Sequence, residues 1–204
     1  MNLILIYIIL LIFISLIFSA VLTGFIRGLL RLRNNRVVVP TDWPSISVIV
    51  PARNEAAVLQ RTLDSIFQQD YPGQWEIVVV DDRSTDETPH ILSRLASENT
   101  RLRVITITDP RPASPKKNAL ARGIKASQGT IIVTTDADCV YDPHWLRSMI
   151  TYMTPEVGVV AGLTEFDLPI LPIPVWQKIQ WLDFIVQQYM AAGAIGYGVP
   201  SSCN

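Results

Sequence analysis

The sequence predicts an α/β protein, with a parallel sheet covered by helices on both faces and one transmembrane helix in front of it. Between residues 46 and 153, short apolar runs alternate with segments of helical periodicity, a pattern typical of a parallel sheet. Residues 3–26 carry no charge and are almost wholly apolar, and about 20 such residues span a bilayer. Polar residues directly follow three of the expected strands.

The apolar segment predicts a membrane anchor over residues 1–26. Arginines follow it and no basic residue precedes it, so the positive-inside rule places the rest of the chain in the cytoplasm, on a single-pass protein. A cleaved signal peptide is the alternative, because Ser19 and Ala20 are small. The long apolar run and the absence of a basic start favour the anchor. A basic linker, residues 27–44, follows it.

Composition limits the rest of the chain to one domain. The 204 residues are 49% hydrophobic, and the residues beyond the anchor are enough for one core. A net charge of −1 gives no indication of nucleic-acid binding. Cys139 and Cys203 are far apart, which argues against a zinc site or a disulfide framework and favours reduced thiols.

The first half of the domain predicts two strands and two helices. Residues 46–50 are an apolar run closed by a proline, typical of a strand. Residues 55–69 repeat apolar positions at helical spacing and end before a Pro-Gly turn. Residues 75–80 form the second expected strand. A helix start follows at Ser84, with Pro89 in its first turn.

The second half continues the alternation. Strands are expected at residues 102–107 and 130–135, separated by a proline-rich loop and a helix over 116–126. A further helix is expected over 143–153. Residues 157–161 are expected to form a fifth strand.

A binding crevice is expected at one edge of this sheet. In such folds ligands bind outside the carboxyl ends of the strands, near the point where the strand order reverses. The first strand is followed by residues 51–55, the second by 81–84 and the fourth by 136–138. Each segment carries acidic side chains, so the crevice is predicted to be acidic.

Asp136 and Asp138 are the strongest candidates for a cation site. Residues two apart in an extended chain point the same way, and two carboxylates suit a divalent cation that carries phosphate oxygens. A solvated turn is the alternative. Asp81, Asp82 and Asp86 can likewise be turn or capping residues, and capping is favoured for Asp86. Converging carboxylates nevertheless repel one another, which favours a function.

Lys116, Lys117 and Asn118 open the helix that precedes the fourth strand. A helix N-terminus with lysines offers N–H groups and positive charge to an anion. Lysine in the first turn opposes the helix dipole, so a diphosphate partner would explain the placement. A solvated basic face remains the alternative.

The segment from residue 45 to 163 resembles a family 2 glycosyltransferase of the membrane-anchored bacterial type, with the nucleotide-sugar-binding half of the Rossmann-like GT-A fold. The resemblance lies in residues 51–55, 80–86, 117–123 and 136–138, in this order. Residues 158–162 resemble the strand that follows in the family. The similarity implies a nucleotide-sugar-binding domain over residues 45–168.

The resemblance also implies a role for each site residue. Glu55 and Asp82 would contact the nucleoside, Asp82 at the base, and Lys117 would lie near the base or the diphosphate. Asp136 would face the ribose or the metal, and Asp138 would bind Mg²⁺ or Mn²⁺. The implied donor-binding set is Pro51, Arg53, Glu55, Asp81, Asp82, Lys117 and Asp136, and the implied metal ligands are Asp136 and Asp138.

By resemblance the protein transfers a sugar, with inversion, from a nucleotide-diphosphate sugar to an acceptor that can be lipid-linked. The family's acidic motif that supplies the general base is expected beyond residue 204, so no catalytic residue is assigned. Glu165, Asp167 and Asp183 are not favoured for that role. Residues 169–204 would begin the acceptor half or form an interfacial membrane helix.

Three other functions are compatible with parts of the sequence. A truncated, non-catalytic protein that only binds a nucleotide sugar, or acts as a scaffold, is the main alternative. A haloacid-dehalogenase-like phosphatase fits less well because its nucleophilic aspartate lies on the first strand, which ends here in Pro51. A receiver domain needs a phospho-acceptor aspartate after the third strand, where Pro110 follows Asp109 and indicates a turn.

Overall fold

The computed structural model describes residues 3–33, 37–109, 114–166 and 173–199. These residues form two compact units. One runs from Val38 to Thr151, and the other combines the chain up to Val37 with the chain from Tyr152 onward.

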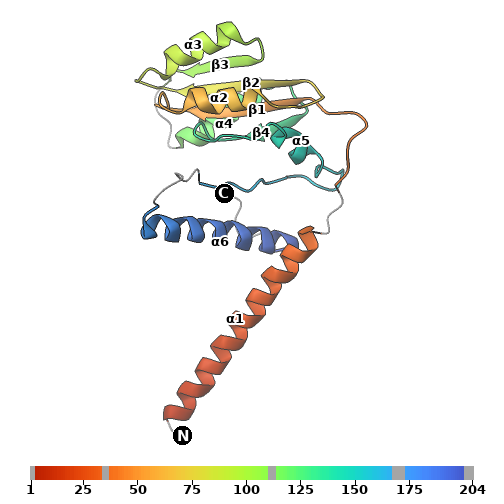
Figure 1. Ribbon diagram of the computed structural model, residues 1–204, viewed down its shortest axis with the longest axis vertical. Coiled ribbons are helices and arrows are strands. Elements are labelled where there is room, and N and C mark those ends of the chain that lie inside the picture. The colour runs from red at the N-terminus through yellow and green to blue at the C-terminus, as the bar shows by residue number, and fades with distance from the viewer. Residues whose placement is uncertain (1–2, 34–36, 110–113, 167–172, 200–204) are drawn as a thin grey trace. The chain divides into compact units, whose positions relative to one another are not determined.

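The unit Val38–Thr151 is built on a parallel sheet (Figure 1). Its described strands have the order β3-β2-β1-β4, and every neighbouring pair is parallel. The fold class and four of the expected strands are confirmed, and two strands extend further than predicted. The strands are β1 (Ile46–Ala52), β2 (Trp75–Asp82), β3 (Leu102–Ile107) and β4 (Ile131–Thr134).

The fifth strand predicted over residues 157–161 is wrong. These residues are irregular and belong to the other unit. Val159, which a buried strand would cover, is 81% exposed. A short apolar run becomes a strand only where a neighbouring strand supplies hydrogen-bond partners, and sequence spacing does not reveal whether one is within reach.

Helices cover both faces of the sheet. Right-handed crossovers place the two helices that link β1 to β2 and β2 to β3 on one face, and the helix that links β3 to β4 on the other. The side chains of β1 and β2 are accordingly buried along almost their whole length. The helices are α2 (Leu59–Phe67), α3 (Thr88–Glu98), α4 (Pro115–Ala126) and the short α5 (Trp145–Ile150).

Two of these helices are shorter than predicted. The segment before α2 forms a turn, in which the Glu55 carbonyl accepts the N–H groups of Val58 and Leu59 at 3.0 and 2.9 Å. The helix expected over residues 143–153 is reduced to α5. Both differences lie at element ends, where backbone groups can bond to turns as readily as to a helix.

The second unit contains two long helices, α1 (Leu3–Arg33) and α6 (Val175–Tyr197). Among the described residues, α1 is the one helix long and apolar enough to cross a membrane. It continues past the predicted anchor to Arg33, since leucine and arginine favour helix and no proline interrupts them. Part of the predicted linker is therefore helical.

Candidate functional site

The strand order reverses between β1 and β4. The chain moves outward from β1 to β2 and β3, and then returns to place β4 on the other side of β1. In open parallel sheets, ligands bind outside the carboxyl ends of the strands at such a switch point. The residues predicted for the site follow β1, β2 and β4 at this edge.

Pro51 lies where β4 has already ended. Ile49 pairs with Thr134, the last residue of β4, and the Ile49 carbonyl accepts the N–H of Thr135 at 3.1 Å. Residue 51 faces the same side as residue 49 along the strand. β4 does not continue opposite residue 51, so the missing N–H of Pro51 removes no hydrogen bond from the sheet. The next polar residue, Arg53, is exposed.

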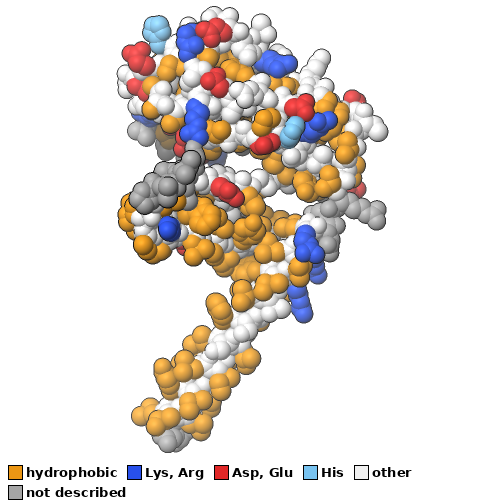
Figure 2. Space-filling view, viewed as in Figure 1, with side chains coloured by type: hydrophobic (Ala, Val, Ile, Leu, Met, Phe, Trp, Pro, Cys, Tyr) orange, Lys and Arg blue, Asp and Glu red, His pale blue; other side chains and the backbone are white. Residues whose placement is uncertain are grey.

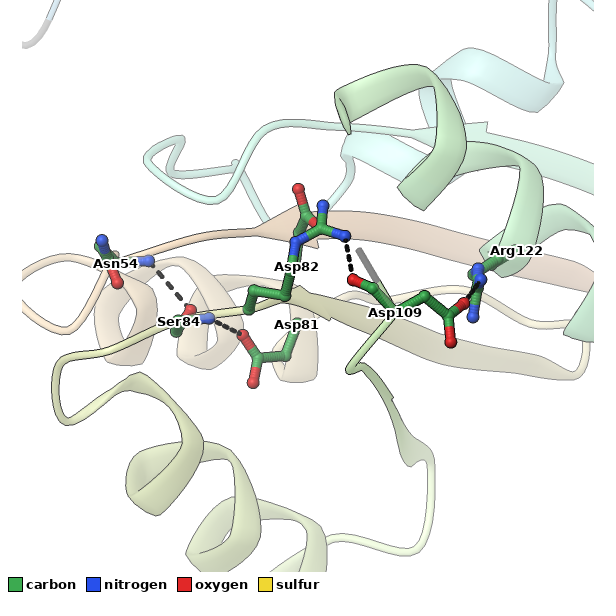
Figure 3. A network of polar contacts seen from close by, with 7 residues as sticks. Asn54, Asp81, Asp82, Ser84, Asp109 and Arg122 are labelled. Atoms are coloured by element: carbon green, nitrogen blue, oxygen red, sulfur yellow. Dashed lines mark hydrogen bonds and ion pairs between the residues drawn. The ribbon is translucent and has the colours of Figure 1, made fainter. Parts of the chain in front are cut away.

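Asn54 ties the loop after β1 to the loop after β2 (Figure 3). Its φ of 57° is in the left-handed region, which asparagine tolerates better than most residues. The Asn54 N–H donates to Ser84 Oγ at 3.0 Å, and its Oδ1 accepts the N–H of Thr85 at 2.8 Å. These contacts hold Glu55, the next residue, at the crevice.

Asp86 and Thr88 add a second set of bonds between the same loops. Asp86 accepts the N–H groups of Ala56 and Thr88 at 3.1 and 3.0 Å, and Thr88 Oγ1 accepts the N–H of Glu55 at 2.9 Å. The hydrogen bond from Thr88 lowers the pKa of the Asp86 carboxyl. Asp86 thus accepts the N–H of the first residue of α3, but the N-cap residue of this helix is Glu87, whose side chain makes no capping hydrogen bond.

The two aspartates that end β2 are buried, with Asp81 1% and Asp82 5% exposed. Asp81 Oδ1 accepts the N–H of Ser84 at 3.1 Å, which is the contact expected of a turn residue (Figure 3). Asp82 forms an ion pair with the neighbouring Arg83. Burying a carboxylate without such partners would be costly.

Arg83 extends this network toward α4. Its guanidinium also donates to the Asp109 carbonyl at 3.0 Å, and the Asp109 carboxylate pairs with Arg122 of α4 (Figure 3). The orientation of Asp82 is therefore coupled to the loop after β3.

Glu55 lies near acidic residues of two other loops, those after β2 and β4. Burial raises the pKa of the Glu55 carboxyl above its ordinary value, and neighbouring negative charges raise it further. These charges belong, in decreasing order of effect, to Asp138, Asp86 and Asp136. The structure thus brings together acids that lie up to 83 residues apart in the chain, from Glu55 to Asp138.

The geometry expected of Asp136 and Asp138 needs a correction. β4 ends at Thr134, and Ala137 and Asp138 lie in a turn instead of an extended strand. Ala137 is buried, and its carbonyl accepts the Thr62 hydroxyl at 2.7 Å. Burial of this one residue fixes the turn and leaves the two flanking carboxylates exposed.

Asp138 is followed by a partly buried thiol. Cys139 is free, and its Sγ donates to Asp138 Oδ1 at 3.6 Å. Burial raises the pKa of this thiol, so it stays protonated and can donate.

Tyr141 stacks on Trp145 with ring centroids 3.8 Å apart, which attaches the loop to α5. Cys203 lies outside the described residues.

The opening lysines of α4 are placed unequally. Lys116 Nζ lies 2.6 Å from Asp136 Oδ1. Lys117, which the resemblance pointed to, is exposed. Successive helical residues project about 100° apart, so one lysine can reach the acid while its neighbour points elsewhere. The sequence does not show which of the two lysines lies near Asp136.

The donor atoms fit a divalent cation that is shared with a phosphate ligand. Among the described residues there is no group of three or more His, Cys, Asp or Glu side chains arranged to hold a metal by themselves. Mg²⁺ and similar ions, however, are commonly held by one or two carboxylates together with substrate phosphates. Asp136 and Asp138 supply oxygen ligands of this kind.

The acids considered for the general base lie in the second unit. Asp183 accepts a hydrogen bond from Gln187 Nε2 at 2.7 Å within α6, and Glu165 is exposed. Asp167 is outside the described residues. No catalytic base is assigned.

Comparison with known proteins gives a consistent result. The family model for glycosyl transferase family 2 matches residues 47–173, which is more than half of the chain. A beta-monoglucosyldiacylglycerol synthase of Nostoc sp. is 37% identical over 132 residues, 64% of this chain and 28% of its own length. The glycosyltransferase AglE of Haloferax volcanii is 32% identical over 128 residues, 62% of this chain and 41% of its own length.

A solved structure shares the fold. It is the mannosyltransferase PcManGT from Pyrobaculum calidifontis in complex with GDP-Man and Mn²⁺, with a TM-score of 0.59 and 34% identity. The match covers 69% of this chain and 42% of that one. The chain therefore spans less than half the length of these relatives. The expected GT-A-like fold is confirmed.

Proposed function

The chain belongs to glycosyl transferase family 2, and on this basis we propose that it binds a nucleotide-diphosphate sugar and takes part in transferring the sugar to an acceptor. The observation that carries the proposal is the convergence of Glu55, Asp136 and Asp138 at the switch point between β1 and β4. Acids that repel one another at a ligand-binding edge favour a cationic partner.

The donor would lie across this edge, with its nucleoside toward β2 and its diphosphate toward β4 and α4. Asp82 and Glu55 are the groups proposed to contact the nucleoside. Asp82 is held in place by Arg83, and Glu55 by the bonds of its loop to Thr88. Positions fixed before binding lose little entropy when the ligand arrives. Pro51, Arg53 and Asp81 complete the proposed donor-binding set.

Mg²⁺ or Mn²⁺ is the proposed cofactor, held by Asp138 and Asp136. When bound, such an ion neutralises the charge that develops on a departing nucleoside diphosphate. Lys116 supplies a further positive charge, and its present partner Asp136 holds it at the place where the diphosphate would bind. The PcManGT complex contains Mn²⁺ and GDP-Man, which supports a divalent cation together with a nucleotide sugar as the bound groups.

We further propose that transfer proceeds with inversion. The acceptor oxygen bonds to the anomeric carbon as the bond from that carbon to the diphosphate oxygen breaks, and a carboxylate base receives the hydroxyl proton. The described part of the chain contains the residues proposed to bind the nucleotide-sugar donor. The configuration of the product, measured by NMR, tests the proposal, and retention would overturn it.

The proposed acceptor is a lipid or is linked to one. The similarity to a synthase of monoglucosyldiacylglycerol supports this, and so does a helix able to cross a membrane in the same chain. The arginines in the last turn of α1, Arg31 and Arg33, favour a cytoplasmic location for the domain. A fluorescent protein fused at the C-terminus would be dark if the domain were exported through the general secretion route.

The decisive experiment measures binding of GDP and UDP with and without Mn²⁺ by calorimetry. Binding by the wild-type chain is expected to require the cation. In Asp138→Asn, which keeps the shape but loses the charge, affinity is expected to fall roughly 10–100-fold, as for the loss of a charged hydrogen-bond partner worth about 1.5–3 kcal/mol. Glu98→Gln, an exposed acid on α3, is the matched control.

Two outcomes would contradict the proposal. Equal nucleotide affinity without the cation, in wild type and Asp138→Asn alike, would remove the metal assignment. Cation-dependent binding with no sugar transfer to any lipid acceptor would instead favour the non-catalytic nucleotide-sugar-binding protein.

A further inference from the structure

The helix α6 has one apolar face that its own unit leaves exposed. Six of its side chains recur at spacings of three and four residues, apart from one adjacent pair, and so lie on a single face of the helix. Each is between 44% and 72% exposed. This apolar stripe consists of Val175, Ile179, Leu182, Val186, Tyr189 and Met190.

The opposite face of α6 is covered by the chain itself. Gln188 accepts the N–H of Thr164 at 2.7 Å and donates to its carbonyl at 2.6 Å. Phe184 packs on Phe166 with ring centroids 4.6 Å apart. Positions 184 and 188 each lie two residues from Val186, about half a turn away from the stripe.

At its C-terminal end, α6 crosses α1 through glycines. A Cβ on Gly28 would lie 1.8 Å from the Gly193 carbonyl oxygen, and one on Gly196 would lie 2.2 Å from the Gly28 oxygen. Only bare backbone fits at such a distance, as at close crossings of membrane helices. Gly24 and Gly28 of α1 have the spacing typical of these contacts.

The crossing lies on the same face of α6 as the stripe. Gly193 follows Met190 by three residues and Tyr189 by four, and Tyr197 follows Gly193 by four. The Tyr197 ring lies over Gly24 at 3.9 Å. The exposed apolar surface of α6 therefore continues directly into that of α1, as Figure 2 shows.

We propose that α6 lies along the surface of the bilayer that α1 enters, with its apolar stripe in the lipid. α6 is not apolar enough to cross a membrane: it carries Lys178, Asp183 and several glutamines, and among the described helices only α1 meets that condition. A helix with one polar and one apolar face lies in the interface instead.

Other side chains have the chemistry expected at this depth. Trp176 is 58% exposed at the edge of the stripe, and tryptophan prefers the headgroup level. Arg31 of α1 lies over the Tyr197 ring, 5.9 Å from its centroid, where it can reach lipid phosphates. The inference depends on α1 as an anchor and not on sugar transfer.

The test places a fluorescent label on opposite faces of α6. Single cysteines are introduced at Leu182, in the stripe, and at Gln180, on the polar side, in the full chain carrying Cys139→Ser and Cys203→Ser. Each protein is labelled with nitrobenzoxadiazole and reconstituted into vesicles of phosphatidylcholine and phosphatidylglycerol. Brominated lipid is expected to quench most of the Leu182→Cys signal, and aqueous iodide most of the Gln180→Cys signal.

A third label, at Phe13→Cys in α1, tests the membrane anchor separately from the position of α6. Quenching of this label by brominated lipid confirms the anchor independently of α6. Water exposure at position 13 would overturn the anchor and with it the proposal. With the anchor in place, iodide quenching at position 182 equal to that at 180 would show the stripe in water. Protection of position 182 from both quenchers would show a protein partner, such as a second copy of the chain.

Discussion

Glu55 is the residue at which the electrostatics of the crevice are most easily measured. Its carboxyl is partly buried and faces three other acids, so its charged form is disfavoured in the folded state. Because the folded-state pKa is above the ordinary value of 4.5, the folded protein holds this proton more tightly than the unfolded chain. The resulting loss of folding stability is absent below the unfolded-state pKa, and it develops as the pH rises through the folded-state pKa.

Glu55→Gln is therefore expected to stabilise the protein at pH 7 and to give no gain near pH 4. The amide keeps the shape of the side chain and removes the disfavoured charge. Denaturant unfolding midpoints at the two pH values measure the effect, with Glu98→Gln as the control at an exposed acid. Saturating Mn²⁺ should reduce the difference, because a cation offsets the repulsion. A lower midpoint for Glu55→Gln at pH 7 would show that the acids are not close enough to repel.

Lys116 and Lys117 provide a matched pair for the diphosphate assignment. Lys116→Ala removes the ion pair to Asp136, in which both side chains are more than half exposed, so stability should change by less than about 1 kcal/mol. Affinity for GDP with Mn²⁺ should fall roughly tenfold or more, as a charged hydrogen bond is lost. Calorimetry on both variants decides between the lysines: a larger loss in Lys117→Ala would favour the residue implied by family resemblance.

At the scale of elements, α4 packs closely against one face of the sheet. Gly123 lets this helix approach the sheet, because a Cβ there would lie 2.5 Å from Ile49 Cγ2 and 3.2 Å from Val80 Cγ2. Both neighbours are buried, β-branched and stiff. The N-terminus of the same helix carries Lys116, so a shift of α4 would also move this lysine.

Gly123→Ala is expected to destabilise the protein by about 1 kcal/mol. Overpacking costs roughly 1–3 kcal/mol, which exceeds the gain of up to about 1 kcal/mol from alanine in a helix. Lys125→Ala, on the exposed side of α4, should change stability by no more than about 0.5 kcal/mol. Urea midpoints compare the two, and a Gly123→Ala variant as stable as the wild type would show that α4 can relax without cost.

At the scale of the whole molecule, the chain divides into a sheet unit and a helical unit. The sheet unit has its own core, and its ends meet: the Val38 N–H donates to the Thr151 carbonyl at 2.9 Å. A segment with a closed core and adjacent ends has the anatomy of an autonomous domain.

The fragment from residue 38 to 151 is therefore expected to fold without the rest of the chain. Circular dichroism and intrinsic fluorescence should report one cooperative transition at the same denaturant concentration, and the fragment should need no detergent. Separate transitions for the two signals, or strong binding of a hydrophobic dye by the fragment, would show that the helical unit completes the core.

Local patterns in the sequence were sufficient for the α/β class, a helix long and apolar enough to cross a membrane, four strands and the order of the site loops. These follow from apolar period, run length and turn residues, each of which depends on neighbours in the chain. Acidic residues after β1, β2 and β4 were predictable for the same reason, since a parallel sheet brings its carboxyl ends to one edge. The roles given to the site residues remain proposals.

Only the tertiary structure decided the finer points. It showed that residues 157–161 are not a strand, that Arg83 joins Asp82 to the Asp109 carbonyl, that Lys116 rather than Lys117 reaches Asp136, and that Ala137 is buried in a turn. The physical reason is common to all four. Each depends on which distant backbone or side-chain atoms come within hydrogen-bonding or packing distance, and residues far apart in sequence acquire that proximity only when the sheet has formed.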